Sequence, residues 1–117
     1  SLIGMVTKIL KDLPQMKADE IYNEAKELEK ESRQDVLEIV SMWLRDVLVL
    51  KDGSARRLYF PSFSGITDRL AEDMSFESIN DAMQSVEKAG AQLLANVKAE
   101  AVYEDLFLKL RRKENGQ

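Results

Sequence analysis

The apolar residues of this chain recur three and four positions apart, the spacing that places side chains on one side of an α-helix. The clearest series follows Ser32 and predicts a helix that runs to about Asp52. Its members are Val36, Val40, Trp43, Val47 and Leu50, with Leu37, Leu44 and Leu48 widening the stripe. The apolar arc covers roughly half of the circumference. We therefore expect a central helix that contacts neighbours on more than one side.

The same spacing predicts further helices over residues 2–13, 17–31, 65–73, 76–95 and 97–112. No segment alternates apolar and polar residues over a useful length, so the chain is predicted to be an all-α, single-domain bundle of about six helices that spans residues 1–117. In the second helix, Ile21 and Tyr22 belong to an apolar side that faces a side made almost entirely of Glu and Lys, and we expect this helix to be thinly anchored at the surface. In the fifth, Phe76 and Gly90 share the apolar side, where a glycine would let another helix approach closely.

Residues that start and stop helices support these boundaries. Pro14 ends the first helix, because a proline disfavours helical geometry in the residue before it. Ser32, Ser64 and Ser75 are candidates to cap the helices that follow them, and Gly53 can adopt the left-handed conformation that ends a helix.

Residues 53–63 form the one long irregular stretch. Its segment Leu58–Pro61 is too short for a sheet element and contains a proline. We interpret it as an extended connector whose aromatic side chains pack on the core. An aromatic binding loop is the alternative interpretation.

Composition excludes several chemistries. The chain has no cysteine, so disulfides and thiolate metal sites are absent, and no histidine, so the commonest general base is absent. The net charge of -4 argues against DNA binding by this domain alone, because phosphate contacts dominate such affinity. The basic cluster at residues 111–113 complements the dipole at the end of the last helix, with phosphate binding as the alternative. No apolar run is long enough to span a bilayer, no signal peptide is visible, and the start at Ser1 indicates an excised fragment or a processed product.

The inventory of reactive groups indicates a protein that is not an enzyme. No glycine-rich phosphate loop is present. Glu20 with Glu24, and Glu100 with Glu104, stand one helical turn apart, but neither pair comes with a histidine, so we interpret both as parts of charged, solvated sides. No serine–lysine pair sits in a recognisable motif. We therefore assign no catalytic, cofactor-binding or metal residue.

Two segments together carry a resemblance to a known family. The first is Trp43-Leu44-Arg45-Asp46-Val47-Leu48, followed by the Lys51–Gly53 turn; the second is Leu93-Leu94-Ala95-Asn96-Val97, followed by Glu104 and Leu106. This order resembles the C-terminal domain of the delta prime family of bacterial DNA polymerase III clamp-loader subunits, which often reads W-x-R-D-x-L and later L-x-x-N-x-N-x-x-L-x-L-E-x-L. The resemblance covers about residues 30–112. The chain departs from the pattern at Lys98, Ala101 and Tyr103, and at the Phe60-Pro61 connector.

The resemblance implies a cytoplasmic, non-catalytic oligomerisation domain that follows two ATPase-type domains. In that family, the domain joins its equivalents in the gamma/tau and delta subunits in a five-membered ring, the collar, which holds the ATPase modules while they place the sliding clamp on DNA during replication. The implied partners are therefore those subunits, with no cofactor, no membrane and no direct nucleic acid. The related gamma/tau collar, a helical adaptor that binds a partner peptide in a groove, and a nucleic-acid-binding helical domain remain alternatives.

The residues of the family pattern also have physical interpretations. Trp43 lies in the middle of the apolar stripe and is expected in the core. Asp46, at the edge of the stripe, is expected to be half-buried and to hydrogen-bond a helix or a connector within the domain. Arg45 falls nearly opposite Trp43 and is the candidate for contact across a subunit boundary. Asn96 is expected to cap the last helix, and Glu104 is a further structural or interface candidate.

Overall fold

The computed structural model describes residues 1–53 and 57–111, and in that part of the chain it contains helices and no strand. The α-helices are α1 (Leu2–Asp12), α2 (Ala18–Leu28), α3 (Arg33–Asp52), α4 (Ser64–Asp73), α5 (Phe76–Leu94) and α6 (Ala99–Leu110). Two short 3₁₀ turns, η1 (Leu13–Gln15) and η2 (Pro61–Phe63), precede α2 and α4. The predicted all-α bundle of six helices is thus confirmed.

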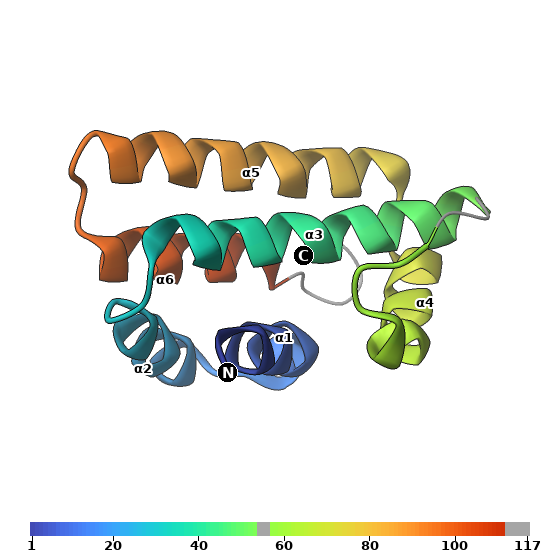
Figure 1. Cartoon of the computed structure of the whole chain (residues 1–117), viewed down its shortest axis with the longest axis horizontal. Helices are drawn as coiled ribbons and strands as arrows, with labels where there is room; N and C mark the ends of the chain where they lie inside the picture. Colours follow the sequence, from blue (N-terminus) through green and yellow to red (C-terminus); the bar gives the residue numbers. More distant parts are fainter. Residues whose placement is uncertain (54–56, 112–117) are drawn as a thin grey trace.

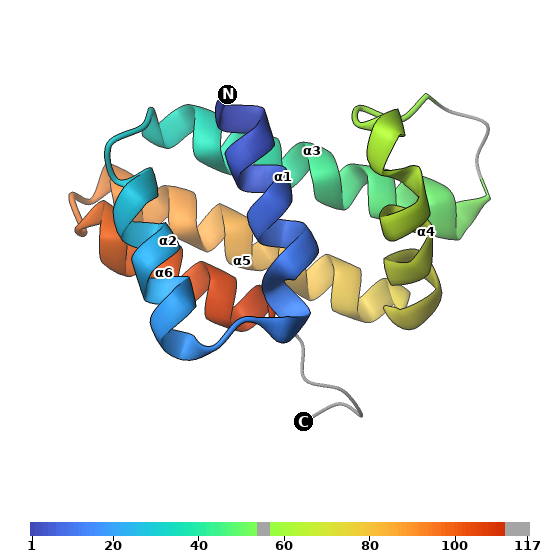
Figure 2. The ribbon, with the colours of Figure 1, turned by 90° about the horizontal axis from the view of Figure 1, so that it is seen from below.

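The six helices are arranged in two directions. The helices α3, α5 and α6 run roughly along the long axis of the molecule, whereas α1, α2 and α4 cross it, as Figure 2 shows. Figure 1 shows α3 between α5 and the N-terminal helices. Because α3 packs against α1, α4 and α5, the prediction of a central helix is confirmed. The helix α6 packs against α2 and α5, so it closes the other half of the core.

Local sequence determines several helix ends. The Ser32 hydroxyl accepts from the Asp35 amide at 3.4 Å, and the Ser75 hydroxyl accepts from the Ser78 amide at 3.0 Å, so both predicted caps are confirmed. Gly53 ends α3 with φ 74° and ψ 17°, the predicted left-handed cap.

The cap predicted at Ser64 is wrong. Ser64 is the first residue of α4, Phe63 is the N-cap, and no side chain caps this end. The turn η2 runs directly into α4, and Ser64 already has helical angles of φ -57° and ψ -34°. An N-cap residue needs an extended backbone, so the serine cannot fold back onto the amides that follow it.

Other boundaries differ from the prediction by a few residues. Pro14 lies within η1, so α1 ends two residues before it, at Asp12. The helix predicted over 17–31 ends at Leu28, and the one predicted over 97–112 covers Ala99–Leu110. Residues 112–117, which include two members of the basic cluster and the tail expected to fray, lie outside the described residues.

Three aromatic residues are more exposed than predicted. Tyr22 is 38% exposed and Phe76 is 54% exposed, although both were expected on buried sides. Phe76 opens α5, where Lys51 places its ammonium 5.2 Å from the ring. In the connector, Phe60 is buried as predicted, but Tyr59 is 50% exposed.

Gly90 is not required by close packing. A Cβ atom at this position would stand 3.7 Å from Cδ1 of Leu37 on α3, which is an ordinary van der Waals distance. The predicted approach of a neighbouring helix is therefore real, but an alanine would fit there as well.

Candidate functional site

Asp46 joins the central helix to the connector. Its side chain is almost completely buried, with 1% of the residue exposed, although the sequence suggested half-burial. Oδ1 accepts from the Tyr59 amide at 2.8 Å, and Oδ2 accepts from the Phe60 amide at 2.9 Å. Hydrogen bonds to an ionised acceptor are among the strong ones in proteins. The carboxylate therefore caps the connector within the domain, as predicted, and places Phe60 in the core.

The two neighbours of Asp46 in the family pattern point elsewhere. Trp43 is 7% exposed and belongs to the core, in agreement with its place in the stripe. Arg45 is half-buried, and within residues 1–53 and 57–111 no carboxylate lies within ion-pairing distance of its guanidinium. Consecutive residues on a helix do not face each other. Arg45 and Asp46 therefore do not neutralise one another.

Asn96 has a structural role that differs from the expected one. It does not cap α6, whose N-cap is Lys98. Instead, it adopts a positive φ of 65° directly after α5, where its amide donates to the Leu93 carbonyl at 3.1 Å and the Val97 amide donates to the Gln92 carbonyl at 3.0 Å. This is the Schellman pattern that ends a helix. Asparagine suits the position because it tolerates the left-handed conformation better than most residues.

Glu100 is buried, contrary to the expected solvated side, with 8% of the residue exposed. A hydrogen bond from the Tyr22 hydroxyl, and next a hydrogen bond from Lys98, hold the pKa of Glu100 below its usual value. The ammonium of Lys98 lies 3.1 Å from Oε1 of the carboxylate. These contacts link α2 to the start of α6. Glu104, one turn further on, is only half-buried and has no ion pair within the described part of the chain.

The residues singled out by sequence do not converge on one site. Trp43, Arg45 and Asp46 lie on α3, Asn96 lies at the corner between α5 and α6, and Glu104 lies on α6. Among the described residues, no hydrogen bond or ion pair joins any two of them. Their arrangement can hold helices and a connector in place, and it leaves Arg45 half-buried on α3.

The described residues contain no cluster of acidic side chains of the kind that binds a metal ion. No group of three or more carboxylates that could hold a metal ion occurs over residues 1–53 and 57–111. Within the same ranges, no helix is both long and apolar enough to cross a bilayer. Over residues 1–53 and 57–111, the hydroxyl of Tyr103 is the buried side-chain polar atom that lacks a hydrogen-bond partner, and burial raises the pKa of this phenol.

Two surface features escaped the sequence analysis. Leu94 is 88% exposed and Val97 is 40% exposed, and both lie at the corner that Asn96 turns. A groove of about 460 Å³ lies between α1 and α2, next to η1, and Glu20 and Glu24 line it. Helical periodicity could not reveal either feature, because each depends on how separate helices meet.

Arg111 also has a specific partner. Its guanidinium donates to the carbonyl of Met16 at 2.8 Å, which ties the end of α6 to the segment between η1 and α2. Arg111 therefore makes a specific hydrogen bond, whereas the sequence suggested only that it complements the helix dipole.

Comparison with known proteins identifies a relationship over most of the chain. Residues 7–112 match the family model described as DNA polymerase III, delta subunit, C terminal. The match begins before the range 30–112 of the sequence resemblance, so it includes most of α1 and all of α2. No curated protein sequence and no solved structure matches the chain.

Proposed function

The chain belongs to the family of C-terminal domains of the DNA polymerase III delta subunit, and from this premise we propose that it is a non-catalytic collar domain of a clamp-loader subunit, of the delta prime type. The family match over residues 7–112 supports the clamp-loader part of this proposal, and its description names the delta subunit without specifying delta prime. The domain then acts in the cytoplasm during DNA replication by holding its subunit in a ring with gamma/tau and delta.

The delta prime type is supported by the tryptophan–arginine–aspartate helix. Trp43 and Asp46 are buried on α3 and stabilise the domain itself. Arg45 is half-buried and free of ion pairs with the described carboxylates, so it can meet a carboxylate of a neighbouring subunit. Arginine suits such a contact because its planar guanidinium binds carboxylates with two parallel hydrogen bonds.

A collar function also agrees with the surface. The net charge is -4, which disfavours binding to duplex DNA through phosphate contacts. The exposed Leu94 and Val97 place apolar surface at one corner of the bundle. Interfaces between subunits combine such apolar contacts with charged rims.

The test is assembly with purified cognate gamma/tau and delta subunits, followed by size-exclusion chromatography with light scattering. We expect the chain to elute with them. Arg45→Glu should weaken this shift without changing the melting curve, whereas Arg69→Glu is the matched control, because Arg69 is exposed on α4. Elution of the chain alone at tens of micromolar would contradict the collar function, and tight, salt-sensitive binding to duplex DNA would favour the nucleic-acid alternative.

A further inference from the structure

The groove between α1 and α2 has an apolar floor and a charged rim. Its apolar lining is Met5 and Ile9 from α1 and Met16 from the segment before α2. The other lining residues are polar or charged: Lys8, Asp12, Gln15, Glu20, Asn23 and Glu24. The volume of about 460 Å³ is in the range of sites that hold small ligands or a few side chains.

The groove follows from how its two walls are anchored. The helix α1 packs mainly on α3, and α2 packs mainly on α6. Each wall therefore contacts a different helix of the layer formed by α3, α5 and α6. Figure 2 shows α1 and α2 side by side in front of that layer. At the end of the groove, Arg111, the residue that follows α6, donates to the Met16 carbonyl at 2.8 Å and fixes the segment that joins the walls. The separation of the walls is therefore built into the packing of the bundle.

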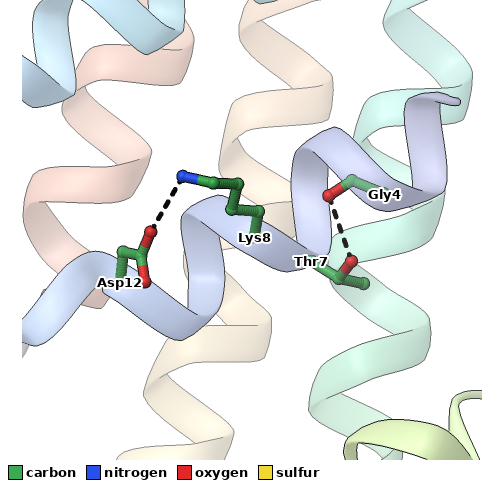
Figure 3. A network of polar contacts seen from close by, with 4 residues as sticks. All are labelled: Gly4, Thr7, Lys8 and Asp12. Atoms are coloured by element: carbon green, nitrogen blue, oxygen red, sulfur yellow. Dashed lines mark hydrogen bonds and ion pairs between the residues drawn. The ribbon is translucent and has the colours of Figure 1, made fainter.

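The charges around the groove are unequal. Three carboxylates, those of Asp12, Glu20 and Glu24, face one ammonium, that of Lys8. Lys8 is already paired with Asp12 one turn further along α1 (Figure 3). The ammonium lies 3.2 Å from the carboxylate. The carboxylate of Glu20 accepts from the Lys17 amide at 2.7 Å, which fixes its position but does not neutralise it. The rim therefore has an uncompensated negative charge beside an apolar floor.

We propose that this groove binds a segment of a partner protein that presents one or two apolar side chains flanked by lysine or arginine. The apolar side chains would cover Met5, Ile9 and Met16, and the basic ones would meet Glu20 and Glu24. Methionine side chains are flexible and polarisable, so two of them at the floor can adapt to different apolar shapes.

The dimensions of the groove limit the occupant. The α1 wall runs from Met5 to Asp12, which corresponds to about 10 Å of helix. Two turns of a bound helix or about three extended residues would fill that length. This surface goes beyond the collar function, which is proposed through α3, because it lies on α1 and α2 and recognises a short segment rather than a whole domain.

The five methionines of the chain provide a direct measurement. Met5 and Met16 line the groove, whereas Met42 on α3, Met74 just after α4 and Met83 on α5 do not, so these three are internal controls. The whole chain would be labelled with ¹³C at its methionine methyl groups and titrated with a synthetic peptide. The peptide has about 12 residues, with two leucines one helical turn apart, flanked by lysine and arginine. The matched peptide has glutamate in place of every basic residue.

We expect the basic peptide to shift the Met5 and Met16 methyl signals with a Kd below about 1 mM, and to leave the other three unchanged. Glu24→Lys should weaken this binding about fivefold or more, because it replaces an attraction with a repulsion at short range. Glu38→Lys, the same charge change at an exposed position of α3, should have no effect.

Several results would overturn the proposal. Equal binding of the glutamate peptide, a joint shift of all five methyl signals, or no shift at saturating peptide would each do so. Shifts of Met5 and Met16 that depend on the concentration of the chain alone would assign the groove to a second copy. The same shifts on deletion of residues 112–117, without peptide, would assign it to the chain's own end. Each outcome is independent of whether the chain joins the gamma/tau and delta ring.

Discussion

Replacement of Asp46 by asparagine should destabilise the domain strongly although it removes no side-chain volume. The two carboxylate oxygens accept from the amides of Tyr59 and Phe60 at 2.8 and 2.9 Å. In Asp46→Asn, one oxygen remains and accepts without the aid of a charge. The other position becomes an NH₂ group, which meets a backbone N–H as donor against donor.

The magnitude follows from these two contacts. A hydrogen bond to a charged group contributes about 1.5–3 kcal/mol, a neutral one about 1 kcal/mol, and a buried donor without a partner costs about 1–3 kcal/mol. The weakening of one bond, about 0.5–2 kcal/mol, and the loss of the other, about 1.5–3 kcal/mol, add to about 2–5 kcal/mol for Asp46→Asn. Asp46→Ala, which removes both acceptors, should cost about 3–6 kcal/mol. For a domain of this size, about 4 °C of Tm corresponds to each kcal/mol, so Tm should fall by roughly 8–20 °C in the asparagine variant.

Urea unfolding followed by circular dichroism measures this loss, with an unchanged m-value as evidence that the native fold is retained. Asp105→Asn is the matched control, because the Asp105 carboxylate is exposed and pairs with Lys109 at 3.0 Å on the surface of α6. Such exposed pairs contribute less than about 1 kcal/mol. Hydrogen exchange at the Phe60 amide should also become faster in Asp46→Asn. Equal losses in the Asp46 and Asp105 variants would refute the reasoning, because the buried carboxylate would then contribute no more than a surface one.

Three further substitutions test the core and the link between α2 and α6. Trp43→Ala should cost about 3–5 kcal/mol in urea unfolding; a loss below about 1 kcal/mol together with lost subunit binding would make Trp43 an interface anchor. Tyr103→Phe should stabilise the domain by roughly 1 kcal/mol, since it removes a buried hydroxyl without a partner; a clear loss of stability would reveal a partner for that hydroxyl. Glu100→Gln should lower Tm at neutral pH. The pKa of Glu100 in the folded domain lies below its ordinary value of about 4.5, so protonation of the carboxylate removes its stabilising contribution. The Tm difference from the unchanged chain should therefore shrink and vanish as the pH falls below about 4.5. A Tm difference that persists in acid would show that the carboxylate charge is not the cause.

The helices could be predicted because their signals are local. The spacing of apolar residues in α3, the Ser32 cap and the Gly53 cap all act within a turn or two of the helix that they define. The burial of Trp43 follows from the same spacing. Such features need no knowledge of the neighbouring helices.

The wrong predictions concern residues whose role depends on a neighbouring element of the fold. Serine is a favoured N-cap residue. The turn η2, however, runs directly into α4, so Ser64 already has a helical backbone. Asn96 stands between two helices, and the local sequence does not determine whether it ends α5 or caps α6. Glu100 shares its charged character with Glu104, yet only Glu100 lies where α2 provides Tyr22 and burial. These assignments depend on tertiary packing, which periodicity does not contain.

The pair Arg45 and Asp46 connects stability with the proposed assembly. Successive residues on a helix point about 100° apart, so two opposite charges side by side in the sequence serve different surroundings. Asp46 is directed inward and is satisfied by two backbone amides. Arg45 is directed toward the surface and has no carboxylate within ion-pairing distance among the described residues. If the guanidinium contributed to the fold, the domain would supply an internal partner for it, as it does for the aspartate. An arginine without an ion pair among the described residues, next to an aspartate that accepts from two amides, is the pattern expected if Arg45 contacts another subunit, as we propose.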